Sequence, residues 1–202
     1  MQPITHFAPL VLASGSSIRQ QMLKACGLQF SVSVSGVDEA ALKPTLADKP
    51  LPQQALALAA AKALAVSADQ PDAYVIGADQ ICAIDGQILS KPGSYDRAEA
   101  QLKQLAGRTH QQHCAVVIAH HGAVVWEHTA TAQLTMRPLD DAAIRAYVGA
   151  DAPLSSCGSY KFEGLGRHLF TQVEGDFDTV QGLPMLPLLN ALHAMKLIGL
   201  GA

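Results

Sequence analysis

The sequence feature that most constrains the fold is a short apolar strand that runs without a break into a polar loop and then into a helix. Residues 9–13, PLVLA, form a continuous apolar run of the kind that buried strands show. The loop SGSS follows, and then Ile18, Met22 and Cys26 recur at helical spacing up to Gly27. A buried strand that leads directly into a helix is a building unit of α/β proteins. We therefore predict an α/β fold.

Strands and helices continue to alternate along the chain, which extends this prediction. We expect a strand at 30–34, a helix at 52–67, and a buried strand, YVIGA, that ends at Asp79. The next two segments, ICAI and QILS, flank Asp85-Gly86, a dipeptide typical of a β-hairpin turn. The first half of the chain is thus predicted to hold strands, helices and one tight hairpin.

The second half of the chain is expected to hold two long strands between helices. A helix is predicted at 97–105, with Asp96 as its cap. The strands CAVVIAH and AVVWEHTATAQLTM then meet at the turn His121-Gly122. The last helix is predicted at 184–198, where apolar residues recur at helical spacing and indicate a face that packs on the core.

Composition and charge exclude several classes of protein. With 49% hydrophobic and 15% charged residues, the chain can bury a core, which excludes a disordered protein. The net charge of −3 provides no long-range attraction to DNA or RNA. No apolar run reaches the ~18 residues that span a bilayer, and the N-terminus lacks the pattern of a secretion signal. We expect a cytoplasmic protein with one domain over residues 1–202 and with no nucleic-acid or membrane partner.

The cysteines and histidines form no recognisable metal or nucleophile motif. The four cysteines are scattered without a C-x-x-C pair, which fits neither a disulfide framework nor a structural zinc site. The pairs His110 with His113 and His120 with His121 fall on or near predicted strands, without the helical H-E-x-x-H context of a zinc site. We expect these histidines to occupy sheet and turn positions.

The SGSS loop is a candidate phosphate site. Where a strand gives way to a helix, backbone N–H groups have no intrahelical partners and the helix dipole favours an anion. Arg19 adds a guanidinium whose geometry suits phosphate oxygens. The alternative is that Ser16 or Ser17 only caps the helix and that Arg19 is solvated. The local pattern favours this alternative, because caps are far commoner than ligand sites.

Acidic side chains form a candidate metal site. Open α/β sheets place ligand and metal groups at the carboxyl ends of strands, so Asp79 is the most informative carboxylate. Asp38 and Glu39 form a second acidic pair, which together with Asp79 could hold Mg²⁺ or Mn²⁺ through oxygen ligands. The alternatives are a turn residue bound by backbone N–H groups at Asp79 and plain surface charge at the acidic pair.

Two lysines are weaker candidates for phosphate contacts. Lys62 lies on the predicted alanine-rich helix, and Lys91 lies in the turn LSKPGS. A single lysine is usually a solvated side chain that lays its stem on apolar surface. The chain contains neither G-x-x-x-x-G-K-[ST] nor G-x-G-x-x-G, so neither a P-loop nor a dinucleotide fold is predicted.

Taken in order, these segments resemble the Maf family of nucleotide pyrophosphatases. The matching segments are LASGSSIRQQML, VDE, LAAAKA, VIGADQICAIDGQILSKP, EAQLKQLAGRTH, CGSYKFEGLG and EGDFDTVQGLP, so the resemblance covers nearly the whole chain. It implies a Maf/ITPase-like fold, with a long, mixed, twisted β-sheet, flanking helices and two lobes around a central cleft. The family is commonly dimeric, so the resemblance also implies a homodimer.

The resemblance implies a role for each candidate residue. Asp79 would be the proton acceptor that activates a water for attack on the α-phosphorus. Glu39 and Asp79 would seat a divalent cation, Mg²⁺, Mn²⁺ or Co²⁺. The triphosphate would be surrounded by Ser14, Arg19, Lys62 and Lys91. The implied reaction is hydrolysis of a nucleoside triphosphate to the monophosphate and diphosphate.

Three positions bear on the choice of base. Gln80 and Glu163 resemble the branch that hydrolyses 7-methyl-GTP, because the dTTP and UTP branch usually has threonine and glutamine there. A carboxylate suits a methylated guanine, which is positively charged and presents N–H donors. Ile18 departs from this branch, which often has a tryptophan suited to stacking on the base. The arginine pair that is usual in the family is reduced to Arg19.

Two alternatives stay open at this point. The first is a pyrophosphatase of the same family that acts on dTTP and UTP. The second is a regulator of cell division that binds nucleotides without turnover, an activity once associated with the family name. A turnover assay separates the second alternative from both enzymes.

Overall fold

The protein folds into two compact units in a computed structural model that describes residues 3–201. The first unit contains the residues up to Asp79, Cys114–Ala130 and the residues from Gly182 on. The second unit contains Gln80–His113 and Thr131–Gln181. The chain therefore passes between the units several times, and one passage lies between Asp79 and Gln80.

Three long strands contribute residues to both units, and every other element belongs to one of them. The shared strands are β4 (Tyr74–Ile84), β6 (Thr109–His120) and β7 (Ala123–Met136). The first unit also holds β1 (Ile4–His6), β2 (Leu10–Leu12), α1 (Ser17–Ala25), β3 (Ser31–Val32), α2 (Glu39–Leu42), the 3₁₀ helix η1 (Lys43–Leu46), α3 (Leu51–Asp69), α7 (Met185–Ala194) and β9 (Ile198–Leu200). The second unit also holds β5 (Gln87–Leu89), α4 (Tyr95–Leu105), α5 (Asp141–Asp151), the 3₁₀ helix η2 (Leu165–Leu169), β8 (Phe170–Glu174) and α6 (Phe177–Gln181).

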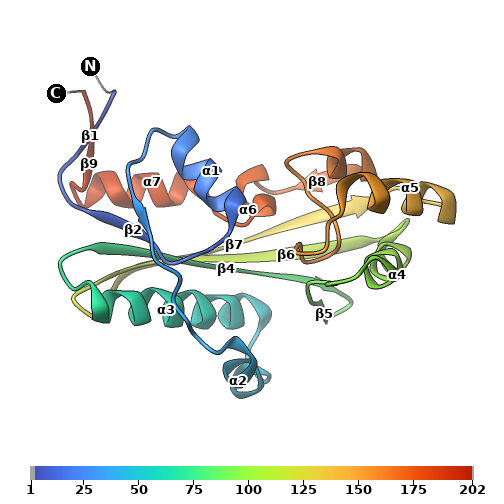
Figure 1. The fold of residues 1–202 in the computed structure, drawn as a ribbon, viewed down its shortest axis with the longest axis horizontal. Coiled ribbons are helices and arrows are strands. Elements are labelled where there is room, and N and C mark those ends of the chain that lie inside the picture. The colour runs from blue at the N-terminus through green and yellow to red at the C-terminus, as the bar shows by residue number, and fades with distance from the viewer. Residues whose placement is uncertain (1–2, 202) are drawn as a thin grey trace. The chain divides into compact units, whose positions relative to one another are not determined.

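The main sheet is mixed, which confirms the predicted fold class. Its seven strands include the hydrogen-bonded series β3-β2-β4-β6-β7-β8, with β5 paired to β4, while β1 and β9 form a separate two-stranded sheet. β2 is parallel to β3 and β4, whereas β5 is antiparallel to β4 and β8 is antiparallel to β7. In the first unit, α3 lies along one face of the strands, and α1 and α7 lie along the other (Figure 1).

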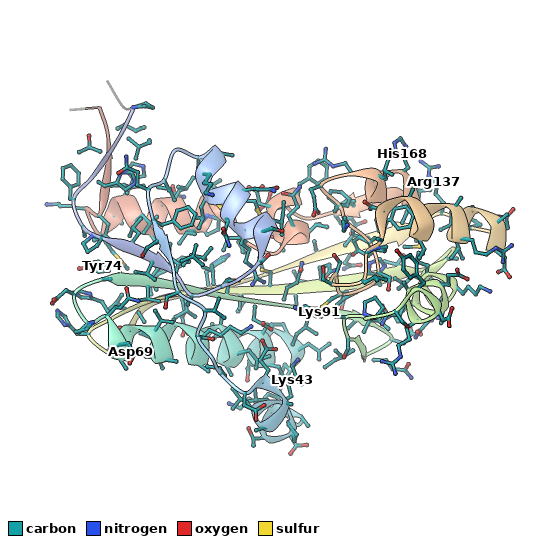
Figure 2. The ribbon with its side chains drawn as sticks, viewed as in Figure 1. Lys43, Asp69, Tyr74, Lys91, Arg137 and His168 are labelled. Carbon is teal, nitrogen blue, oxygen red and sulfur yellow. The ribbon has the colours of Figure 1, made fainter. Side chains whose placement is uncertain are left out.

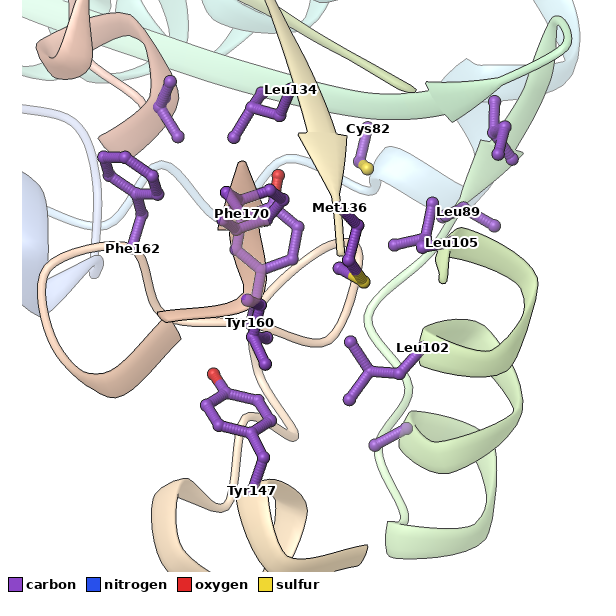
Figure 3. Packing of buried hydrophobic residues seen from close by; sticks show 14 of the residues in the cluster. Cys82, Leu89, Leu102, Leu105, Leu134, Met136, Tyr147, Tyr160, Phe162 and Phe170 are labelled. Atoms are coloured by element: carbon purple, nitrogen blue, oxygen red, sulfur yellow. The ribbon is translucent and has the colours of Figure 1, made fainter. Parts of the chain in front are cut away.

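Each unit has its own hydrophobic core. In the first unit, Leu12, Ile76 and Ile118 from three strands pack against residues of α1 and α7. In the second unit, residues of α4 and α5 pack against Leu134 and Met136 of β7 and against a group of aromatic rings (Figure 3). The apolar runs recognised in the sequence therefore form two separate cores.

The structure confirms most of the predicted elements and corrects four details. The strand that carries Asp79 does not end there, because β4 continues to Ile84. Glu39, which lies outside the predicted helices, is the first residue of α2. The predicted cap Asp96 is wrong, since the Ser94 side chain caps α4 by accepting from the N–H of Arg97. The helix predicted at 184–198 ends at Ala194, and residues 198–200 form β9.

The hairpin predicted at Asp85-Gly86 is confirmed by the antiparallel pairing of β4 with β5. The strand pair around His121-Gly122 is likewise confirmed as β6 and β7. Among residues 3–201, no helix combines the length and apolar character needed to cross a membrane.

Candidate active site

The alternation of side chains along β4 decides which residues share a face with Asp79. Successive side chains of a strand point to opposite faces, so Gly77 and Asp79 point one way while Ile76 and Ala78 point the other. Ile76 and Ala78 are buried in the core of the first unit. A Cβ placed on Gly77 would lie 2.3 Å from the backbone oxygen of Ala59 on α3. Gly77 and Asp79 therefore face α3.

The close approach at Gly77 brings Lys62 of α3 to the Asp79 side chain. The Lys62 Nζ lies 2.6 Å from Asp79 Oδ1 and 2.8 Å from Glu39 Oε1. The side chains of Lys62 and Asp79 are 12% and 11% exposed, so their ion pair is largely shielded from water. The structure thus joins three sequence candidates, Glu39, Lys62 and Asp79, around one ammonium group.

Glu39 has a second cation beside it. Its Oε2 lies 3.1 Å from Nζ of Lys43, one helical turn further along the chain. Burial raises the pKa of Glu39, but the hydrogen bonds and charges of Lys62 and Lys43 outweigh burial and hold the pKa at about 2. Asp38, the other member of the acidic pair, instead caps α2 by accepting from the N–H of Ala41 at 3.1 Å.

The lowered pKa of Glu39 predicts a pH-dependent contribution to stability that requires Lys62. The folded pKa of about 2 lies below the ordinary value of 4.5. Ionised Glu39 therefore stabilises the fold above pH 4.5, and this contribution is lost as the pH falls towards 2. Its size is about 1 kcal/mol or less, because more than a third of the Glu39 side chain is exposed.

The test compares the wild type with Lys62→Met by urea unfolding at pH 7 and pH 3. We expect the variant to be less stable at pH 7 and the difference in unfolding free energy to shrink at pH 3. Lys43→Met is the matched control, since Lys43 contacts the same carboxylate but is 57% exposed, and its effect should be smaller. An equal difference at both pH values would contradict the role assigned to Lys62.

The two carboxylates suit a divalent cation. Among residues 3–201, no three His, Cys, Asp or Glu side chains converge as a metal site. Mg²⁺, however, is commonly bound by one or two carboxylates together with water and substrate phosphates. Glu39 and Asp79 already place one oxygen each on a common cation, the ammonium of Lys62. The donor set therefore fits a metal that is completed by the oxygens of a phosphate ligand.

Arg19 fixes the loop that follows β2. Its Nε donates to the carbonyl of Gly182 at 2.8 Å, and its Nη1 donates to the carbonyl of Ala78 at 2.9 Å and to Ser14 Oγ at 3.2 Å. The backbone N–H of Ser16 also donates to Ser14 Oγ, at 3.3 Å. The solvated arginine considered above is therefore wrong, because Arg19 is tied to three separate segments of the first unit.

The end of β2 explains why the Ala78 carbonyl can accept from a side chain. β2 pairs with β4 up to Leu12 opposite Ile76, and the N–H of Ala13 makes one further bond to the Ile76 carbonyl. Beyond this point the chain leaves the sheet, so the next carbonyl on that side of β4 accepts from Arg19 instead of from a strand. Arg19 is thereby held beside the residue that precedes Asp79.

The loop before α1 keeps the features of an anion site. Ser16 occupies the N-cap position, but within residues 3–201 its side chain makes no capping hydrogen bond. Ser14 Oγ accepts two hydrogen bonds and can still donate its own proton to a phosphate oxygen. Ser14 is 7% exposed, so its orientation is fixed by the surrounding protein. This arrangement favours the phosphate interpretation of the SGSS loop over simple capping.

Gln80 is anchored inside the second unit. Because neighbours on a strand point to opposite faces, the Gln80 side chain points away from the face that carries Asp79. Its Nε2 donates to the carbonyls of Val180 at 2.8 Å and Thr179 at 3.1 Å, both in α6. The amide nitrogen is thus used to hold α6, and Oε1 is the atom that can meet a ligand.

Ile18, Lys91 and Glu163 are the remaining sequence candidates. Ile18 packs against the core of the first unit and is partly buried. Lys91 (labelled in Figure 2) follows β5 in the second unit and is exposed. Glu163 is exposed in the second unit, and its charge contributes, after burial and Asp151, to raising the pKa of Tyr147. The roles assigned to these three side chains stay predictions.

The histidines occupy sheet and turn positions, as expected. His110 and His113 lie on β6, where burial lowers the pKa of both, that of His110 to about 4. His110 Nε2 lies 2.8 Å from the hydroxyl of Tyr160. His120 stacks on Tyr74, and His121 has the positive φ of a hairpin turn. These four histidines thus occupy positions in the sheet and its turn.

Sequence reasoning missed Gly77 and Gly182. Gly77 permits the approach of α3 to β4, and a signal for it was present, since small residues recur at Ala55, Ala59 and Ala63 on one helical face. Gly182 has a φ of +98°, a conformation that other residues rarely adopt, and its carbonyl accepts from Arg19. No local pattern indicated that carbonyl as a partner of Arg19.

The chain is similar in sequence to a known protein family and to several named proteins. A family model described as Maf-like protein matches residues 9–195. A protein of Legionella pneumophila (strain Paris) named nucleoside triphosphate pyrophosphatase is 40% identical over 192 residues, which cover 95% of this chain and 96% of that protein. A Bradyrhizobium diazoefficiens protein of the same name is 42% identical over 193 residues, with 95% and 96% covered.

A further relative has a more specific name. A protein of Brucella abortus biovar 1 (strain 9-941) named 7-methyl-GTP pyrophosphatase is 42% identical over 193 residues, which cover 94% of this chain and 97% of that protein. These matches span nearly the whole chain, as the resemblance noted in the sequence does.

Proposed function

Because the chain belongs to the Maf family, we propose that it is a nucleoside triphosphate pyrophosphatase that prefers 7-methyl-GTP and releases 7-methyl-GMP and diphosphate. As such a pyrophosphatase it is a hydrolase of phosphoric anhydride bonds. We propose that its physiological role is the removal of modified nucleotides. The homodimer and the cytoplasmic location expected from the sequence stay predictions.

The observation that carries the proposal is the pair of carboxylates held on Lys62 beside the segment that Arg19 fixes. Glu39 and Asp79 lie 2.8 and 2.6 Å from the ammonium of Lys62. Arg19 binds the carbonyl of the residue that precedes Asp79 and also orients Ser14. A triphosphate needs cationic and hydroxyl donors, and its hydrolysis needs a base near the α-phosphorus. The first unit supplies both kinds of group, because Asp79 lies on β4 while Lys62 contacts Asp79 and Arg19 contacts the carbonyl of Ala78.

In this proposal Asp79 and Lys62 each have two tasks. Asp79 accepts the proton of the attacking water, with Lys62 holding its Oδ1 in place. Ser14, Arg19 and Lys62 bind phosphate oxygens and offset the charge that develops as diphosphate leaves. A bound Mg²⁺, Mn²⁺ or Co²⁺, held by Glu39 and Asp79, would add charge neutralisation at the phosphates. Lys91 is proposed as a further phosphate contact.

Support for 7-methyl-GTP comes from Glu163, Gln80 and the Brucella relatives. Two relatives named 7-methyl-GTP pyrophosphatase are each 42% identical to this chain. Glu163 is exposed and can accept from the N–H donors of a guanine that carries a positive charge. The Oε1 of Gln80 offers a further acceptor. These features favour a cationic purine over a pyrimidine.

The proposal is tested by a hydrolysis panel with the purified protein. 7-Methyl-GTP, GTP, dTTP and UTP are each incubated with Mg²⁺, Mn²⁺ or Co²⁺, and with EDTA, while diphosphate release is measured. We expect the highest kcat/KM for 7-methyl-GTP and loss of turnover in EDTA. A higher kcat/KM for UTP and dTTP would favour the sister specificity. Binding of all four nucleotides without cleavage would favour the non-catalytic regulator.

A substitution at Glu163 tests the basis of the preference. Glu163→Gln keeps the size of the side chain but removes its charge, so we expect kcat/KM for 7-methyl-GTP to fall about tenfold and that for UTP to change little. Glu127→Gln is the matched control, because Glu127 is also exposed and loses the same charge in the first unit. Equal effects of Glu163→Gln on both substrates would remove Glu163 from base recognition.

A further inference from the structure

We propose that Phe177 is a specificity residue of this enzyme, whose exposed ring stacks on the positively charged base while Glu163 accepts hydrogen bonds from it. This inference rests on the proposed function, since it names how the base of that substrate is recognised. The residues that carry it all belong to the second unit.

Phe177 has a large aromatic side chain that remains exposed to solvent in the folded protein. It is 56% exposed, although five other apolar or aromatic residues of the neighbouring segments are buried, namely Tyr160, Phe162, Leu169, Phe170 and Val180. Single exposed apolar side chains are common and need no explanation by themselves. The contacts and charges around Phe177 therefore indicate whether its exposed ring can bind a ligand.

The first relevant contact is with Phe162. The two ring centroids are 5.6 Å apart and the rings are inclined by 50°, so Phe162 supports one side of the exposed ring. Phe162 is 5% exposed and lies at one edge of the second core (Figure 3). The next residue in the chain is Glu163, which is exposed. The residue that supports the exposed ring is thus followed in the chain by an exposed carboxylate.

The second relevant contact fixes the helix that carries Phe177. Gln80 donates two hydrogen bonds to carbonyls of α6, those of Thr179 and Val180, and both of these residues are buried. Asp176 reinforces the segment, because its Oδ1 accepts from the N–H of Asp178 at 3.3 Å. Phe177 is therefore held by the protein, which lowers the entropy cost of stacking a ligand on it.

The charges around Phe177 favour a cationic ring. Asp176 and Asp178 flank it in the chain, and burial followed by the charge of Asp176 raises the pKa of Asp178. Glu163 follows Phe162, the residue whose ring supports Phe177. The guanidinium of Arg167 lies 5.4 Å from the centroid of Phe162, so the cation supplied by the protein is placed on the buried member of the ring pair. The exposed ring of Phe177 then suits a cation supplied by a ligand.

Ile18 does not offer a comparable surface. It has no aromatic face, and it packs against the core of the first unit. A flat base that carries a positive charge gains most from an aromatic ring beneath it. N7-methylated guanine is such a base, and ordinary guanine, which is uncharged, should gain less from the same ring.

The test compares Phe177→Leu with Phe177→Trp. Leucine keeps an apolar side chain against Phe162 but lacks an aromatic face, so we expect kcat/KM for 7-methyl-GTP to fall about tenfold and that for GTP by less than about threefold. Tryptophan should retain or raise the preference for 7-methyl-GTP. Phe7→Leu is the control, because Phe7 is an exposed phenylalanine of the first unit and its loss should leave the ratio of the two kcat/KM values unchanged.

Titration calorimetry with 7-methyl-GMP gives a readout that does not need turnover. We expect Phe177→Leu to weaken binding about tenfold while the melting temperature stays near that of the wild type. An unchanged dissociation constant and an unchanged kcat/KM ratio in Phe177→Leu would overturn the inference, as would an equal loss with both triphosphates. If the wild type cleaves no triphosphate, the proposed function fails, and the calorimetric comparison then decides this inference.

Discussion

Replacing Asp79 by asparagine is expected to reduce kcat for diphosphate release by about a thousandfold, within the range that removal of a general base costs. The amide keeps the size of the carboxylate, and its oxygen can still accept from Lys62 Nζ at the place of Asp79 Oδ1. What it lacks is the ability to take up the proton of the attacking water. The loss should therefore appear in kcat more than in KM.

The measurement is diphosphate release from 7-methyl-GTP at saturating substrate with the divalent cation present. Asp69→Asn is the matched control, because Asp69 is the exposed last residue of α3, the helix that also carries Lys62. It should retain full turnover. Circular dichroism of Asp79→Asn should match that of the wild type. Turnover of the folded variant within a few fold of the wild type would exclude Asp79 as the base.

Replacing Gly77 by alanine is expected to destabilise the protein by about 3 kcal/mol, at the upper end of what an added methyl group costs in a packed core. The new Cβ would lie 2.3 Å from the backbone oxygen of Ala59 and 2.9 Å from the backbone nitrogen of Ala63. Backbone atoms of a long helix cannot move aside individually, so α3 as a whole has to shift away from β4. Because Lys62 lies on α3, its contact with Asp79 should weaken as well.

The measurement for Gly77→Ala is the melting temperature, which should fall by about 6–12 °C for a chain of this size. Gly149→Ala is the matched control, since Gly149 lies within α5 and a Cβ there meets no atom of the described chain within 4 Å. Alanine should leave that helix unchanged or stabilise it slightly. A melting temperature of Gly77→Ala equal to that of the wild type would show that α3 does not press on β4 as described.

The two expected losses have separate causes although Gly77 and Asp79 lie two residues apart. Asp79→Asn changes the chemistry and leaves the packing in place, whereas Gly77→Ala changes the packing that brings Lys62 to Asp79. Lys62→Met, tested by its pH-dependent stability, leaves Gly77 and Asp79 in place and removes the positive charge that Glu39 and Asp79 both contact. The three variants together separate proton transfer, packing and charge pairing at one place on β4.

The amino-acid sequence determined the local structure and the identity of most candidate residues. Apolar runs, helical spacing and the Asp85-Gly86 turn each depend on neighbours in the chain, so they identified most strands and helices and the hairpin. The resemblance to the Maf family implies roles for Glu39, Lys62 and Asp79, which lie far apart in the chain. The strand predicted to end at Asp79 continues to Ile84, because the polar pair Asp79-Gln80 interrupts the apolar run while the backbone continues as β4.

Only the tertiary structure decided which partners these residues have. Lys62 and Asp79 are 17 residues apart in the chain, Gln80 and Val180 are 100 apart, and Arg19 and Gly182 are 163 apart. Two of these three contacts end on backbone carbonyls, which every residue possesses and no sequence pattern distinguishes. Such contacts depend on how segments far apart in the chain pack together. For Lys62 and Asp79, the absence of a side chain at Gly77 permits the close packing of α3 on β4.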